Sequence, residues 1–143
     1  MSHGTIFSST VHKTEEWLNE LQEALHVDDE RKAYQALRAT LHTLRDRLPP
    51  GEAAHLGSQL PMLVRGFYYE GWKPDAPPLK IRTPQEFYDI VQKKASEADK
   101  DVVGDAPRVV GTVLGFLTRK ISPGEVEHVK RALPDDLGSL WPE

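Results

Sequence analysis

Apolar residues recur at intervals of three and four along most of this chain, which is the spacing of one buried face of an α-helix. The clearest run ends at two prolines, Pro49 and Pro50, which cannot continue a helix. An earlier run begins at Thr14, a residue type that caps helices, and ends near His26. Both runs therefore predict amphipathic helices. The stripe of the clearest run consists of Tyr34, Leu37, Leu41, Leu44 and Leu48.

The same pattern of residues occurs twice. Residues 48–61 resemble residues 121–134 at an offset of about 73 positions, which is how an internal repeat shows itself. Each copy predicts two longer helices followed by two shorter ones. We therefore predict an all-α fold, a helical bundle of about eight helices built from two tandem copies of a four-helix unit, with the apolar face of each copy buried against the other.

The predicted boundaries follow from this repeat. Residues 1–13 are polar and aperiodic and predict a frayed tail, whereas residues 14–143 predict a single helical domain. Copy one spans 14–71 and copy two spans 83–143. Between them, the prolines of residues 72–82 exclude regular structure and predict a stiff, extended connector. A chain of this length buries a real core without disulfides or metals.

Composition narrows the classes of function. The chain has no cysteine, which excludes a thiolate nucleophile and a thiolate metal site. Its formal net charge of -4 argues against broad nucleic-acid binding, because that binding depends on neutralising phosphates. We find neither a signal peptide nor the run of about 18 apolar residues that spans a membrane, and we predict a cytoplasmic protein without a membrane partner.

A Glu-x-x-His pair occurs in both copies, as Glu52 with His55 and as Glu125 with His128. Residues three apart lie on one face of a helix, and di-iron carboxylate bundles draw ligands from two such motifs. Both glutamates, however, also occupy the position at which a carboxylate caps a helix, and the long helices lack the further glutamates that such bundles use. The sequence favours capping, leaves a metal site as the alternative, and predicts no cofactor.

Basic residues form a strip on the long helix of copy one, at spacings of four, three, four and three. Such a face can hold a carboxylate, a phosphate or an acidic partner helix, because arginine presents a planar fork to these groups. The alternative is a solvated face that makes ordinary salt bridges. Copy two has lost the strip. Its members are Arg31, Gln35, Arg38, His42 and Arg45.

An aromatic group follows Arg65 and can form either a partner surface or core that anchors the connector. Its members are Phe67, Tyr68, Tyr69 and Trp72. The chain has no nucleophile elbow, phosphate loop, dinucleotide fingerprint or His-Glu-x-x-His motif. No catalytic residues are predicted.

Several stretches carry a recognisable pattern: Trp17-Leu18, residues 36–49, residues 52–61, residues 65–72, and Leu133-Pro134 with residues 140–142. This pattern resembles the bacterial proteins grouped as domain of unknown function 2267. The resemblance covers nearly the whole chain from about Thr14. It implies a prokaryotic, soluble, helical, duplicated domain with no established activity, so there are no family catalytic residues to carry over.

The sequence thus predicts a non-enzymatic helical binding or interaction module that recognises a protein partner or itself, or else a small anionic ligand. The predicted binding residues are Arg31, Arg38, His42, Arg45, Arg65, Tyr68, Tyr69 and Trp72. The alternative is a metal-binding protein or metal-dependent enzyme, and it requires four side chains to converge within a few ångströms. These are Glu52, His55, Glu125 and His128.

Overall fold

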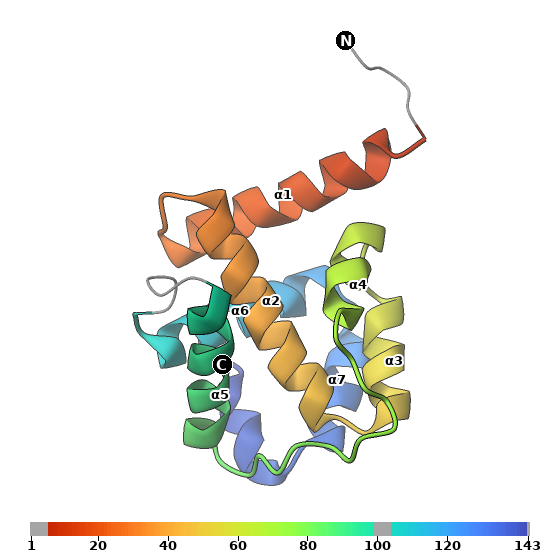
Figure 1. Ribbon diagram of the computed structural model, residues 1–143, viewed down its shortest axis with the longest axis vertical. Helices are drawn as coiled ribbons and strands as arrows, with labels where there is room; N and C mark the ends of the chain where they lie inside the picture. The colour runs from red at the N-terminus through yellow and green to blue at the C-terminus, as the bar shows by residue number, and fades with distance from the viewer. Residues whose placement is uncertain (1–5, 99–103, 143) are drawn as a thin grey trace.

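The computed structural model describes residues 6–98 and 104–142, and these residues form a bundle of helices without strands (Figure 1). The helices are α1 (Ser8–Leu25), α2 (Glu30–Arg47), α3 (Pro50–Ser58), α4 (Met62–Tyr69), α5 (Pro84–Ala98), α6 (Ala106–Lys120), α7 (Pro123–Ala132) and η1 (Asp135–Leu140). The predicted all-α bundle of about eight helices is confirmed. Its origin in two tandem copies stays a prediction. Within the described ranges, no helix combines the length and hydrophobicity needed to cross a membrane.

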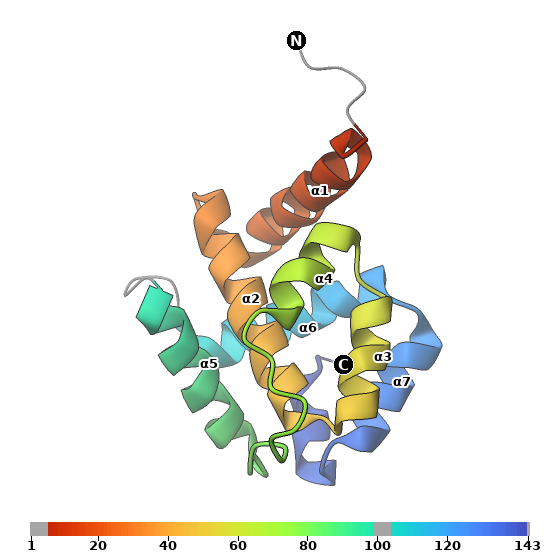
Figure 2. The same ribbon diagram turned by 45° about the vertical axis from the view of Figure 1, so that its right-hand side comes forward.

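Helix α2 is the centre of the bundle. It runs through the middle of the molecule in both views and contacts α1, α3, α4, α5 and α6 (Figures 1 and 2). Leu37 and Leu41 of its leucine stripe are fully buried, and the small residues Ala33 and Ala36 are buried as well. Small side chains let neighbouring helices approach closely, so α2 packs on more than one side.

Helix α1 begins at Ser8 rather than at Thr14. The Thr14 hydroxyl does not cap a helix end but donates to the Thr10 carbonyl oxygen at 2.7 Å, one turn earlier in the same helix. The predicted tail was therefore wrong for residues 8–13, while residues 1–5 lie outside the described part of the chain. The first turns of α1 extend beyond the rest of the bundle (Figure 2).

The connector at residues 72–82 is irregular, as its prolines predict, and it is held against α2. The Leu79 N–H donates to the Asp46 carbonyl oxygen at 2.8 Å, and Arg47 Nε donates to the Ile81 carbonyl oxygen at 2.7 Å. Ile81 is fully buried in the core. These contacts place the connector across the end of α2 and lead the chain into α5.

Helices α3 and α7 lie side by side in both views and run in opposite directions (Figures 1 and 2). The last of the two shorter helices predicted for copy two is the 3-10 helix η1 rather than an α-helix. Its hydrogen bonds join residues three apart, from the Leu137 N–H to the Pro134 carbonyl and from the Trp141 N–H to the Gly138 carbonyl. A glycine inside so short a segment disfavours a regular α-helix.

Candidate metal centre

Four side chains of metal-ligating types converge where α3 packs against α7. They are Glu52, His55, Glu125 and His128, and one ligand atom from each lies within 4.8 Å of the others. Ligand atoms bound to one first-row metal ion at about 2.0–2.2 Å are at most about 4.4 Å apart. A shift of a few tenths of an ångström would therefore bring the four atoms onto a single ion. No other such group of three or more occurs in the described residues.

The spacing of each pair and the packing of the two helices produce this convergence. Three residues apart, the glutamate and histidine of each helix lie on one face, and those two faces meet. His55 Nδ1 contacts Glu125 Oε2 across the helix pair. The rings of His55 and His128 lie 5.9 Å apart between centroids. The condition that the sequence set for a metal site, convergence within a few ångströms, is met by these atoms.

The Glu125 carboxylate is the most buried of the four groups, with its side chain only 1% exposed. Burial raises the pKa of the Glu125 carboxyl, His55 acts in the opposite direction, and the adjacent Glu52 raises the pKa further. The polar groups that face the Glu125 carboxylate are the His55 imidazole and the Glu52 carboxyl, whose hydrogen bond is one of the causes that raise the pKa of Glu125; no backbone N–H of the described residues donates to it. An ionised carboxylate buried in this way is costly unless a proton or a cation neutralises it.

Helix capping does not account for the Glu125 carboxylate. Ser122 Oγ accepts a hydrogen bond from the Glu125 N–H at 3.1 Å, as a cap should, but the carboxylate does not return a bond to the backbone. The capping box before α5 is complete by comparison, because the Thr83 N–H donates to Glu86 Oε1 at 3.2 Å. Glu125 instead turns its carboxylate towards α3.

Glu52 occupies the position in α3 that Glu125 occupies in α7. A carboxylate there has even less opportunity to cap the helix. The residue before α3 is Pro49, which has no N–H for a carboxylate to accept from. Glu52 Oε1 is buried and has no hydrogen-bond partner among the described residues. Both glutamates thus hold carboxylate oxygens inside the protein, close to two imidazoles.

The predicted residues Arg65, Tyr68 and Tyr69 hold the helix that carries Glu52 and His55. The hydroxyl of Tyr68 donates to the Ala53 carbonyl oxygen at 2.7 Å, and that of Tyr69 donates to the Ala54 carbonyl oxygen at 3.2 Å. Arg65 Nε donates to the Gly57 carbonyl oxygen at 3.1 Å. Burial raises the pKa of the Tyr68 hydroxyl, so this group remains a donor. All three side chains connect α4 to α3.

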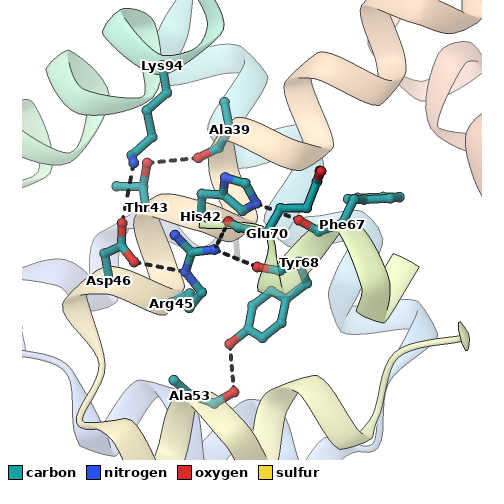
Figure 3. A network of polar contacts seen from close by, with 10 residues as sticks. All are labelled: Ala39, His42, Thr43, Arg45, Asp46, Ala53, Phe67, Tyr68, Glu70 and Lys94. Carbon is teal, nitrogen blue, oxygen red and sulfur yellow. Dashed lines mark hydrogen bonds and ion pairs between the residues drawn. The ribbon is translucent and has the colours of Figure 1, made fainter. Parts of the chain in front are cut away.

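His42 and Arg45 of the predicted basic strip in turn hold α4 (Figure 3). Arg45 Nη1 donates to the carbonyl oxygens of Tyr68 and Glu70 at 2.7 and 2.8 Å. His42 Nε2 donates to the Phe67 carbonyl oxygen at 2.6 Å. These bonds satisfy carbonyl groups at the end of α4, which have no partners within that helix. A continuous set of polar contacts therefore leads from α2 through α4 to α3.

The remaining predicted binding residues are arranged differently. Arg38 Nε lies 3.7 Å from Glu70 Oε1, and the Trp72 ring lies 5.3 Å from the Tyr69 ring between centroids. Arg31 pairs with Asp29 at the start of α2 at 3.5 Å. A cavity of about 580 Å³ brings four of the predicted residues together and does not include Arg31. Those four are Arg38, His42, Arg45 and Trp72.

One residue on the helix that carries Glu125 and His128 was not singled out from the sequence. Arg131 is exposed and follows His128 by three residues, so it continues the line of Glu125 and His128 along α7. The signal that could have identified it is the extension of the motif from Glu-x-x-His to Glu-x-x-His-x-x-Arg, which occurs at residues 125–131 and not at residues 52–58.

Comparison with known proteins gives a family and no activity. A family model described as an uncharacterized conserved protein, DUF2267, matches residues 14–140. The matched range includes α3, α7 and all four convergent side chains. The comparison with curated proteins found no match.

Proposed function

We propose that this chain, which belongs to the DUF2267 family over residues 14–140, is a metal-binding protein. One observation carries the proposal. The Glu125 carboxylate is buried, is not used for capping, and lies within ligand distance of Glu52, His55 and His128. A divalent cation at this point would neutralise the buried charge and give each of the four side chains a partner.

The chemistry of the four groups selects the kind of ion. Imidazole nitrogens suit zinc, iron, copper and nickel, whereas magnesium and calcium prefer sites made of oxygen alone. Carboxylate oxygens favour the harder ions of the first row, and no thiolate is present to select copper(I). We therefore propose a single divalent ion of the class that includes zinc, iron, manganese and cobalt.

A bound ion would also join two parts of the fold that are distant in sequence. Its ligands come from α3 and α7, which follow the first and the second long helix pair of the bundle. A ligand that binds only the folded chain stabilises it in proportion to the logarithm of its concentration above Kd. Metal binding should therefore raise resistance to unfolding as well as fill the site.

The test is elemental analysis by mass spectrometry of the untagged protein purified without chelator. We expect zinc, iron or manganese at close to one ion per chain. Changing His55→Ala together with His128→Ala should remove this metal, because both imidazole ligands are lost. His12→Ala is the matched control, since His12 is an exposed histidine on α1 outside the site and its loss should leave the metal content unchanged.

Two results would overturn the proposal. One is a metal-free protein that also fails to take up zinc, manganese or iron(II) when they are added to the purified chain. The other is a metal content that the double histidine variant retains in full. Circular dichroism of each variant should keep the helical signal of the parent chain, which separates loss of ligands from loss of fold.

A second candidate function is the interaction module predicted from the basic strip, and the cavity of about 580 Å³ supports it. Arg38 and Lys73 lie at this cavity together with Glu70, between α2 and the connector. Arg45 and Lys94 also line the cavity but bind main-chain carbonyls and Asp46, so Arg38 and Lys73 are the cations that a small carboxylate or an acidic segment of a partner would suit. Arg38→Glu with Lys73→Glu should then abolish recovery of a partner in a pull-down and leave the helical circular dichroism intact. Undiminished recovery would exclude this surface.

A further inference from the structure

We infer that the metal ion held by the four side chains keeps a coordination position open to solvent, and that this position takes a small anion with a nitrogen or oxygen donor. This inference rests on the proposed function, because it concerns the same ion. It adds that the site is open and can bind a further ligand, in contrast to a closed structural metal site.

The exposure of the four groups differs from one side of the site to the other. The Glu125 side chain is 1% exposed and Glu52 is half-buried, whereas the His55 side chain is 52% exposed and His128 is exposed. The carboxylates therefore lie at the base of the site and the imidazoles at its rim. Closed structural metal sites surround their ion with protein, while sites that bind further ligands leave one side accessible.

The source of the ligands points in the same direction. All four come from α3 and α7, and no third helix supplies a histidine or acidic group to the cluster within the described residues. Iron(II), manganese(II) and cobalt(II) accept more than four ligands in oxygen- and nitrogen-rich sites. Four protein ligands from a single helix pair then leave the outward position to water or to an exchangeable ligand.

Charge decides which ligands are preferred there. Two carboxylates balance the charge of a divalent ion, so the site has no excess charge to hold a polyanion, and a ligand with at most one negative charge is expected. Arg131 is exposed and lies three residues beyond His128 on the same face of α7. Its guanidinium adds positive charge at the rim on the side of His128 and can pair with the free end of a bound anion.

The experiment uses cobalt(II), whose visible absorption reports on its ligands, and azide as the anion. The metal-free full-length chain is loaded with one equivalent of cobalt and titrated with sodium azide at constant ionic strength. We expect cobalt bands that azide shifts in a saturable way, with one azide per cobalt. Arg131→Gln should weaken azide binding several-fold without changing cobalt affinity, and Arg131→Lys should restore part of it.

The outcomes separate this inference from the proposed function. Cobalt bands that azide leaves unchanged would overturn the open position while the metal site stands. Azide that strips cobalt from the chain, measured as cobalt passing a filter that retains protein, would overturn it as well. Equal azide affinity in the parent chain and Arg131→Gln would remove Arg131 from the site. If neither the parent chain nor its His12→Ala variant shows cobalt absorption bands, both proposals are overturned.

Discussion

His42 Nε2 lies 2.6 Å from the carbonyl oxygen of Phe67, so an imidazole of α2 donates a hydrogen bond to the end of α4 (Figure 3). A carbonyl oxygen only accepts, and this fixes the proton of the neutral ring on Nε2. Burial lowers the pKa of His42 to about 4, the bond to Phe67 opposes this change, and the charges of Arg45, Arg38 and Lys94 lower the pKa further. His42 is therefore neutral in the folded protein at pH 7.

This relationship predicts how stability depends on pH. The unfolded chain binds a proton at His42 near the ordinary pKa of about 6.5, whereas the folded chain does so only near 4, so protonation favours unfolding as pH falls. The contribution is fully present above pH 6.5 and is lost between there and pH 4. We expect a loss of about 2 kcal/mol between pH 7 and pH 5, measured by urea unfolding.

The matched control for this pH dependence is His42→Gln, whose side-chain amide can donate to the same carbonyl but does not titrate. The free energy of unfolding of this variant should change less with pH over the same range. Parallel curves for the two proteins would show that another group causes the dependence.

Arg45 should contribute more to stability than Arg38, although both belong to the same basic strip. Arg45 is 3% exposed and donates to two carbonyl oxygens and to Asp46 Oδ1, whereas the Arg38 side chain is 30% exposed and has a 3.7 Å contact with Glu70. Arg45→Met should lower the free energy of unfolding by about 3 kcal/mol, because buried acceptors lose a charged donor. Arg38→Met should cost less than about 1 kcal/mol. Similar losses in urea unfolding would contradict this difference.

The contrast between these arginines shows which features of the structure can be predicted from the sequence. Spacing places Arg38 and Arg45 on one face of α2, and the structure has them on that helix. Besides the neighbouring Asp46, the partners of Arg45 are main-chain carbonyls at the end of α4, which any residue would provide. No side-chain pattern marks such partners, so the sequence could predict the helix and its face but not which arginine would be buried.

Prediction of the candidate metal centre from the sequence has the same limit for a different reason. Glu86 and Glu125 occupy equivalent positions after a capping hydroxyl, and their sequence contexts predict the same role. Glu86 completes its capping box, while Glu125 turns to His55 because α3 packs beside it. The Glu-x-x-His spacing marked four candidate residues, and only the packing of α3 on α7 shows that the two pairs meet.

Tyr68→Phe should weaken metal binding without touching a ligand. The Tyr68 hydroxyl is buried and donates to the carbonyl oxygen of Ala53, the residue after Glu52. Loss of this bond should lower the free energy of unfolding by about 1 kcal/mol and loosen the start of α3. Zinc affinity, measured by competition with a chromophoric chelator, should fall several-fold. Tyr69→Phe removes a longer, exposed bond to Ala54 and should affect both quantities less.

Glu125→Gln should have opposite effects on the metal-free and the metal-loaded protein. Glutamine has the shape of the neutral acid and carries no charge into the buried site, so the metal-free variant should be more stable than the parent chain by about 1 kcal/mol. The same change removes an anionic ligand and should lower metal affinity by tenfold or more. Thermal unfolding with chelator and with added zinc measures both effects.

Glu86→Gln provides the control for that reversal, because Glu86 Oε1 accepts bonds from the Thr83 N–H and hydroxyl at an exposed helix start. Glutamine keeps an Oε1 acceptor and loses only the charge beside the helix start, so this change should cost about 0.3–1 kcal/mol at most, equally with and without zinc. If Glu125→Gln loses the same small amount of stability with and without zinc, the Glu125 carboxylate stabilises the start of α7 and does not bind a metal ion. If the melting temperatures of Glu125→Gln and the parent chain cross on addition of zinc, then α3 and α7 hold Glu125 inside the protein for the ion.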